Sequence, residues 1–370
     1  MEKKFIKFVD IQKWSSNPEI KDGVIECLDQ GRLSGGIGVQ NLEEKISDKF
    51  NYNSFAGVNS GTAALHLSLL SIGIQTGDYV AVTSLSFVSS ASSILMANAI
   101  PIFIDVYKDG NLNLDSLEVA CKQYKIKAVL AVHLYGNPCN IERLLKLSKH
   151  FDFKIVEDCA QAIGALVNGK SVGTFGDVGI VSFYASKNLP GGEGGGVICN
   201  SQSILADVQS RRNHGRTNHY DYDRVGFNYR MSDIFAKIVE VNLKNFDDEI
   251  QVRRKQAEVY SSTLSSKKIE YVIQSSYGQS VFHQFVLLHE KRDKFVAALN
   301  ESGIGTAIVY PVLLHTTKLF KDSIYVTSGV DEGWDKYIVN NCFSLPLGGH
   351  IEDSELNYIV DQVEQIHKKI

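Results

Sequence analysis

Short apolar segments alternate with amphipathic ones from residue 78 to residue 159, and this alternation restricts the fold more than any other feature. The apolar segments are DYVAVTS, IPIFIDV, KAVLAVHLY and FKIVEDC, and stretches with helical spacing separate them. Strands that are apolar along their whole length belong to parallel sheets covered by helices on both faces. Because DVGIVSFYAS and GGGVICN continue the series, the sequence predicts an α/β fold with a mainly parallel central sheet.

The flanks of this region suggest how the chain is divided. Residues 17–50 have the pattern helix, turn, helix, with the turn at GRLSGGIG. A helical pattern begins at about residue 236 and runs through AKIVEVNLKNFDDEIQVRRKQAEVYSSTL, with one charged face. We expect this long helix to lead from a large domain, residues 1–245, into a smaller C-terminal α/β domain, residues 246–370.

Composition excludes several classes of protein. The formal net charge is −4, and we find no run of five like charges, so the chain lacks the positive field of a nucleic-acid-binding protein. Its longest apolar run is far shorter than the roughly 20 residues that a membrane span needs. The N-terminus has no signal-peptide core, and the six cysteines are scattered without zinc or disulfide spacing. We expect a cytoplasmic protein that has no metal site and binds neither membrane nor nucleic acid.

Polar residues gather where the predicted strands end. Asp158 closes FKIVED, while Ser182 and Lys187 follow GIVSF. Ser60, Gly61 and Thr62 come directly before a predicted helix, where backbone N–H groups can bind an anion. Because ligands of open parallel sheets bind beyond the carboxyl ends of the strands, we expect an acid, an amine and an anion site to converge at one edge.

Each of these residues alone has a structural explanation. A Ser-Gly-Thr sequence before a helix is more often a helix cap, a single lysine is nearly always solvated, and the glycines behind Lys187 can simply allow a bulge. The combination and its order in the chain favour a functional site.

Six motifs occur in the order found in a known family: SGTAAL, FVSSASS, VHLYG, EDCAQAIGA, SFYASKNLPGGEGG and GFNYRMSD. Over about residues 30–235 the chain resembles the DegT/DnrJ/EryC1/StrS aminotransferases, and the tail, with VYPVLLH and SLPLGGH, is similar but looser. The resemblance implies the type I fold of aspartate aminotransferase, pyridoxal 5'-phosphate (PLP) as cofactor, pyridoxamine 5'-phosphate as its intermediate form, and a homodimer with a shared active site.

The resemblance also implies a role for each matching residue. Lys187 would carry the cofactor as a Schiff base and move the proton during transfer, since only a neutral amine attacks an aldehyde. Asp158 would pair with the ring nitrogen and keep it protonated. Gln161 would bond the phenolic oxygen of the ring, and Phe87 or a neighbour would stack on one ring face.

The phosphate of the cofactor would be held by hydroxyl and amide groups. Gly61 and Thr62, at the start of a helix, and Ser182, after a strand, supply them within the chain. Asn228, in GFNYRMSD, would reach the phosphate of the partner subunit. A simple turn before the following helix explains this asparagine about as well.

The implied reaction transfers an amino group, with glutamate as the expected donor, to a 3- or 4-keto group of a nucleotide-linked (dTDP-, UDP- or GDP-) deoxysugar. Tyr310 and His315, in the looser tail, are candidate substrate contacts. The segment Ser34 to Gly38 is a candidate entrance for the substrate, although a plain turn between helices fits it equally well.

Three alternatives remain open. The family includes sugar 3-dehydratases, in which histidine replaces the Schiff-base lysine, but residue 187 is Lys. A non-catalytic sensor with the same fold would be expected to lose Asp158 or Lys187, and both are present. A metal site in NHGRTNHYDYD would use His214, His219, Asp221 and Asp223, whose irregular spacing favours a loop instead.

Overall fold

The computed structural model describes residues 5–31, 33–330 and 333–370, and its centre is an eight-stranded sheet. The strand order is β1 (Phe55–Val58), β9 (Gly195–Cys199), β8 (Val178–Ser182), β5 (Lys154–Asp158), β4 (Ile126–Val132), β2 (Tyr79–Thr83), β3 (Ile100–Ile104) and β11 (Val326–Ser328). Strand β9 runs antiparallel to both neighbours, and the other strands run parallel to one another. This confirms the predicted, mainly parallel sheet.

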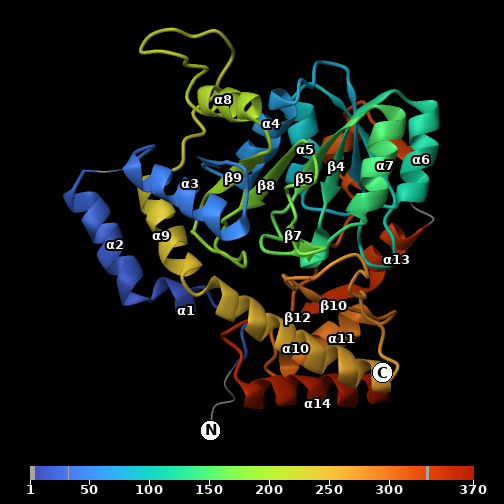
Figure 1. Ribbon diagram of the computed structural model, residues 1–370. Coiled ribbons are helices and arrows are strands. Elements are labelled where there is room, and N and C mark those ends of the chain that lie inside the picture. Colours follow the sequence, from blue (N-terminus) through green and yellow to red (C-terminus); the bar gives the residue numbers. More distant parts are fainter. Residues whose placement is uncertain (1–4, 32, 331–332) are drawn as a thin grey trace.

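Helices cover both faces of the sheet (Figure 1). One apolar cluster contains residues of α3 (Ile37–Phe50), α6 (Leu114–Gln123), α7 (Ile141–Phe151) and α9 (Asp233–Leu243). The other contains residues of α4 (Gly61–Ser71), α5 (Val88–Met96) and α8 (Gln202–Arg211). Along β2, Ala81 packs in the first cluster, and Val80 and Val82 pack in the second. The strands are apolar throughout because each of their faces is buried against a helical layer.

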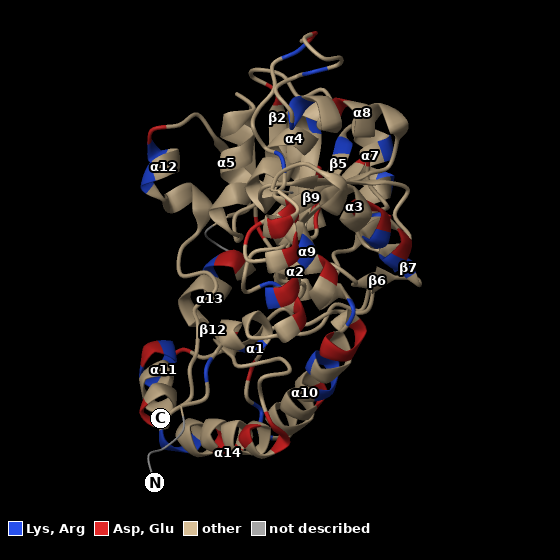
Figure 2. Cartoon of the chain, turned by 90° about the vertical axis from the view of Figure 1, so that its left-hand side faces the viewer, with Lys and Arg blue, Asp and Glu red and all other residues tan. Residues whose placement is uncertain are grey.

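A third apolar cluster forms the core of the C-terminal part, which lies at one end of the molecule (Figure 1). There α10 (Phe246–Ser266), α11 (Arg292–Glu301) and α14 (Asp353–Lys369) surround the antiparallel pair of β10 (Phe285–Leu288) and β12 (Cys342–Leu345). Tyr260, Phe295 and Phe343 fill its centre. Figure 2 shows basic and acidic residues along the length of α10, as expected for a helix with one solvated face.

The remaining elements are short, apart from α2. They are the helices α1 (Ile11–Ser15), α2 (Pro18–Asp29), α12 (Lys318–Lys321) and α13 (Trp334–Asn341), the 3₁₀ turns at Leu134–Gly136 and Leu314–Thr316, and the strands β6 (Leu166–Val167) and β7 (Lys170–Ser171). No helix among the described residues is both long enough and apolar enough to span a lipid bilayer.

The single long helix predicted from residue 236 is wrong, because the chain forms two helices there. Helix α9 ends at Leu243 and α10 begins at Phe246, and the two meet at an angle (Figure 1). Before the break, Val239 packs on the large sheet, whereas Tyr260 later packs in the C-terminal core. A straight helix cannot serve both cores, and Asn245, a weak helix former, occupies the turn.

The division at residue 245 stays a prediction. Backbone pairing crosses it at several places: β11 pairs with β3 at the edge of the large sheet, and isolated bridges join Ile6 to Ile304 and Leu166 to Gln279. The N-terminal strand-like segment therefore packs with the C-terminal part, and a later segment of the chain returns to the large sheet.

Glu157, directly before Asp158, anchors the loop between β5 and β8. Its carboxylate accepts hydrogen bonds from His133 Nε2 at 3.1 Å and from the backbone N–H groups of Gly173, Phe175 and Gly176 at 2.7–2.9 Å. Burial alone would raise the pKa of Glu157, but these hydrogen bonds lower it overall. A fully buried carboxylate is stable here because every donor facing it is paired.

We expect Glu157→Gln to lower the free energy of unfolding by about 3 kcal/mol, because the new amide group faces buried N–H donors. Urea denaturation at neutral pH measures this loss. Since the folded pKa of Glu157 is lowered, its contribution is present above the unfolded pKa and is lost as pH falls through the folded pKa. The difference in the free energy of unfolding between the wild type and Glu157→Gln should therefore become smaller at acidic pH.

Glu118→Gln is the matched control, because Glu118 forms an exposed ion pair with Lys122 and its loss should change stability little. Equal effects of the two substitutions would contradict the anchoring role of Glu157.

Candidate active site

A cavity of about 440 Å³ lies at the carboxyl edge of the sheet. It is lined by Asp158 at the end of β5, Ser182 at the end of β8, and Gly61 and Thr62 at the start of α4. Lys187, in the loop that follows β8, also lines it. The residues that the sequence places at separate strand ends therefore share one cavity.

The Asp158 carboxylate is held by hydrogen bonds at both oxygens. Oδ1 accepts the N–H of Ala160 at 3.0 Å, and Oδ2 accepts the hydroxyl of Ser90 at 3.0 Å. Ser86 lies 2.8 Å from Ser90, Oγ to Oγ. Burial raises the pKa of Asp158, and the two donors oppose the rise, with a smaller contribution from the positive charge of Lys187. The arrangement favours an ionised, oriented carboxylate that can pair with a cationic ring nitrogen.

The Lys187 amine has an environment that favours its neutral form. Burial lowers the pKa of Lys187 to about 8, although the charge of Asp158 acts in the opposite direction. An ordinary lysine titrates about two units higher. At neutral to slightly basic pH a substantial fraction of this amine is therefore unprotonated, as a nucleophilic lysine must be.

At the start of α4, where the sequence predicts an anion site, backbone amides and hydroxyl groups lie together. Ser60 caps the helix, with its Oγ accepting the N–H of Ala63 at 3.1 Å. A Cβ atom at Gly61 would lie 3.0 Å from the Ser182 Cβ, a tight contact that glycine avoids. Thr62 Oγ1 lies 2.7 Å from Ser89 Oγ. Helix-start amides and several hydroxyl groups together suit a phosphate dianion.

Gln161 is fixed in one orientation by the backbone. Its Oε1 accepts the N–H of Tyr135 at 2.7 Å, which leaves Nε2 to donate to the hydroxyl of Tyr310 at 2.9 Å. The ring of Phe87 lies 6.1 Å from that of Tyr310, centroid to centroid. All three predicted residues, Gln161, Phe87 and Tyr310, line the cavity.

Three predicted residues lie outside the lining of this cavity. Asn228 and Ser34 are exposed. His315 is buried, with its ring 5.7 Å from Phe103 and 6.5 Å from Tyr325, centroid to centroid. Their predicted roles toward a partner's cofactor or toward substrate stay predictions.

Several lining residues were missed by sequence reasoning. Ser89 and Ser90 lie within the motif FVSSASS, where four serines gave no reason to prefer one of them. In the structure Ser89 contacts Thr62 and Ser90 contacts Asp158. His283 also lines the cavity, and it comes from a segment about 100 residues after Lys187 whose sequence gave no signal.

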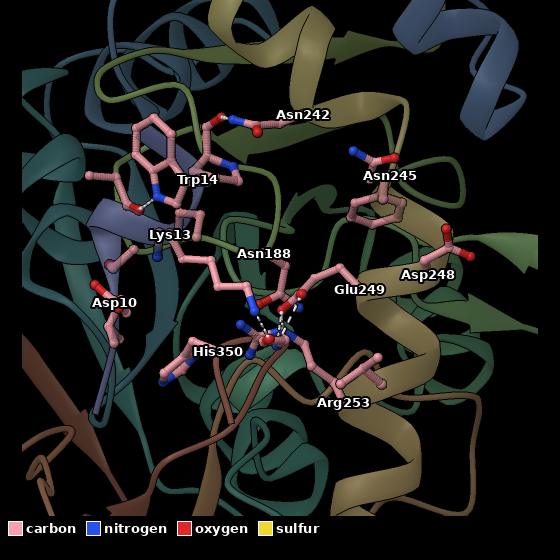
Figure 3. A pocket seen from close by; sticks show the side chains of 18 of the residues that line it. Asp10, Lys13, Trp14, Asn188, Asn242, Asn245, Asp248, Glu249, Arg253 and His350 are labelled. Carbon is pink, nitrogen blue, oxygen red and sulfur yellow. Dashed lines mark hydrogen bonds and ion pairs between the residues drawn. The ribbon is translucent and has the colours of Figure 1, made fainter. Parts of the chain in front are cut away.

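A second cavity of about 440 Å³ adjoins the loop that carries Lys187, between α1, the first turns of α10 and the turn at Gly349 and His350 (Figure 3). Trp14 Nε1 donates to the carbonyl of Ala185 at 3.2 Å, and Lys13 donates to the carbonyl of Gly349. These contacts tie the Lys187 loop, through α1, to the C-terminal part.

The loop residues weighed for a metal site do not form a cluster of ligands in the described chain. The group with suitable spacing there is His133, Glu157 and Cys159. His133 Nδ1 accepts the N–H of Cys139, and its Nε2 bonds Glu157, so both ring nitrogens are already engaged by protein groups. This group is explained as part of the buried anchor around Glu157.

The donor set of the main cavity fits PLP. Lys187 offers an amine for the aldehyde, Asp158 a carboxylate for the ring nitrogen, and Gln161 Nε2 a donor for the phenolic oxygen. The start of α4 together with Thr62, Ser89 and Ser182 offers amides and hydroxyls for the phosphate. Each polar group of the cofactor has a chemically matched partner in one cavity.

Comparison with known proteins agrees with this chemistry. The model of the DegT/DnrJ/EryC1/StrS aminotransferase family matches residues 15–364. A GDP-perosamine synthase of Escherichia coli O157:H7 is 31% identical, over 98% of this chain and 99% of its own. A UDP-N-acetyl-3-dehydro-alpha-D-glucosamine 3-aminotransferase of Acidithiobacillus ferrooxidans is 31% identical over 94% and 93%.

Two further matches extend the comparison. A protein of Geobacillus stearothermophilus named as a pleiotropic regulatory protein is 31% identical, over 95% of both chains. The crystal structure of Streptomyces venezuelae DesV in complex with a ketimine intermediate superposes with a TM-score of 0.94, at 28% identity, over 99% of this chain and 100% of that one. The chain belongs to the DegT/DnrJ/EryC1/StrS aminotransferase family and is a PLP-dependent sugar aminotransferase.

Proposed function

We propose that the protein transfers the amino group of glutamate to a 3- or 4-keto carbon of a nucleotide-linked deoxysugar, in the cytoplasm. The observation that carries the proposal is the shared cavity of Lys187 and Asp158, in which burial lowers the lysine pKa to about 8. The sugar nucleotides named for the relatives, linked to GDP or UDP, support this substrate class.

The residues divide the work by position. PLP, when bound, supplies an electron sink for the carbon that loses its proton. Asp158, held by Ser90 and Ala160, keeps a negative charge at the place of the ring nitrogen. With the cofactor bound, Lys187 Nζ would move a proton from the donor carbon to the cofactor carbon in the first half of the reaction, and from the cofactor carbon to the sugar carbon in the second. Gln161, oriented by the backbone of Tyr135, fixes the ring in its plane.

The competing family activities fit these residues less well. A sugar 3-dehydratase would have histidine in place of Lys187, and a sensor would have no need of an amine with a lowered pKa next to a buried carboxylate. Amino transfer by the purified protein tests both alternatives.

We further propose that the active form is a homodimer. The segment between α8 and α9 projects from the molecule (Figure 1), with Tyr220, Tyr222 and Val225 exposed on it. Ile25 and Leu28 of α2 are also exposed. Several large apolar side chains exposed on these two segments support an interface in which a second copy of the chain buries them.

The pKa of Lys187 predicts how its reactivity depends on pH. In the cofactor-free protein, acetylation of Lys187 by acetic anhydride should rise through about pH 8, well below the midpoint of the exposed Lys154, whose pKa is raised by its ion pair with Asp177. Asp158→Asn should move this midpoint lower, because the carboxylate charge raises the lysine pKa. Mass spectrometry of the labelled peptides measures both. A midpoint equal to that of Lys154 would contradict the lowered pKa.

Lys187→Ala should abolish amino transfer, with a fall of at least about a thousandfold, because no other amine lines the cavity in the described chain. Adding glutamate to the wild type should shift the visible band of the lysine-bound cofactor to the near ultraviolet, with 2-oxoglutarate released. The variant should lack the visible band yet melt at the wild-type temperature. Lys154→Ala is the control, and full activity of Lys187→Ala would sink the assignment.

The dimer proposal predicts a role for an exposed residue. Asn228→Ala should weaken PLP binding, since we propose that Asn228 contacts the phosphate bound by the partner subunit. Titration of the cofactor-free protein with PLP measures the affinity, and sedimentation gives the oligomeric state. Asn218→Ala, on the same projecting segment, is the control. A monomer that binds PLP as tightly as the wild type does would exclude this role.

A further inference from the structure

His283 is a buried histidine that lines the cofactor cavity and is not used in the roles described above. The backbone places it there. The N–H of Val281 donates to the carbonyl of Gly136 at 3.1 Å, and the N–H of Gln284 donates to the carbonyl of Tyr135 at 3.3 Å. The segment that carries His283 is thereby bonded along the turn that follows β4, beside the site.

The tautomer of His283 is set by its neighbour Asn188. The Nδ2 of Asn188 donates to the carbonyl of Val281 at 3.0 Å, so its Oδ1 must be the atom that faces the histidine ring. His283 Nδ1 lies 3.0 Å from that oxygen. Because a carbonyl oxygen only accepts, Nδ1 carries the proton and Nε2 is left as an acceptor.

Nε2 has no hydrogen-bond partner among the described residues. Burial, with added repulsion from the positive charges of Lys187 and Arg253, lowers the pKa of His283 well below its ordinary value. The ring is therefore neutral at physiological pH, and Nε2 keeps its lone pair. Nε2 is therefore an acceptor to which a ligand in the cavity can donate a hydrogen bond.

The next residue also has an acceptor without a donor in the described chain, although that atom, unlike Nε2, is buried from solvent. Gln284 also lines the cavity, and its Oε1 is buried without a donor in the described part of the chain. Two neighbouring acceptors that lack donors indicate a ligand rich in hydroxyl or N–H groups.

We propose that His283 Nε2 accepts a hydrogen bond from a hydroxyl group of the sugar substrate bound beside Lys187. The inference rests on the proposed function and names a residue that recognises the sugar. The lone pair of Nε2 repels the carboxylates of the amino donor, and the one ring proton, on Nδ1, is already donated to Asn188. An uncharged hydroxyl is the substrate group that matches it.

Two substitutions distinguish the roles of the two ring nitrogens of His283. In His283→Asn the amide can still donate to Asn188 but nothing reaches the position of Nε2. In His283→Gln the longer side chain places an acceptor oxygen near that position. The substrate is whichever dTDP-, UDP- or GDP-linked 3- or 4-keto deoxysugar the wild type aminates. We expect kcat/KM for this sugar to fall about ten- to a hundredfold in His283→Asn and to recover most of this loss in His283→Gln.

The glutamate half-reaction, followed by the loss of the visible band in a single turnover, should stay within about twofold in both variants. Deoxy analogues of the sugar, each lacking one hydroxyl, complete the test. One analogue should lose the same factor with the wild type and lose nothing further with His283→Asn, because the substitution and the missing hydroxyl remove the same hydrogen bond.

Each other result has a definite meaning. Equal losses in both half-reactions would show that His283 only supports the structure and would overturn the proposal, as would wild-type kinetics in His283→Asn. If glutamate removes the visible band of the wild type but neither the 3-keto nor the 4-keto sugars are aminated, the proposed function itself fails, independently of His283.

Discussion

The opposed charges of Lys187 and Asp158 in a buried site are the interaction on which the chemistry depends. Burial lowers the pKa of Lys187 and raises the pKa of Asp158. The charge of each group opposes this shift in the pKa of the other. The resulting pKa of Lys187 is about 8. This value is lower than the pKa of a solvated lysine and higher than that of a buried lysine with no neighbouring anion. Because the balance is electrostatic, any group that adds charge nearby also changes the reactivity of the lysine.

The structure fixes polar side chains around this pair through the backbone. The peptide N–H of Tyr135 decides which way the Gln161 amide points, and the carbonyl of Val281 does the same for Asn188. The Gln161 amide then donates a hydrogen bond to the Tyr310 hydroxyl. The Asn188 amide determines which ring nitrogen of His283 carries the proton. Backbone groups do not rotate freely, so the hydrogen-bonding directions in the cavity are set before a ligand arrives.

Sequence patterns predict the parts of the site that lie at the ends of buried strands. Asp158 and Ser182 are found this way because a parallel sheet brings its carboxyl ends together. The break between α9 and α10 could not be predicted, since it depends on which core each half packs against. His283 was also missed: its place depends on hydrogen bonds with Tyr135 and Gly136, nearly 150 residues earlier, and no local pattern records such a pairing.

The charged residues of the cavity and the neutral residues that can bind a sugar are different residues. Its charged lining residues in the described chain are Asp158, Lys187 and Glu193, whereas Gln161, His283 and Tyr310 are neutral. A cation at the position of His283 would lower the lysine pKa further, and an anion would raise it. Neutral acceptors can hold a sugar close to Lys187 without disturbing that pKa. Because the hydroxyl groups of a sugar are uncharged, neutral acceptors are enough to bind them. An aminotransferase can therefore recognise a sugar next to the reactive amine and leave the pKa of that amine unchanged.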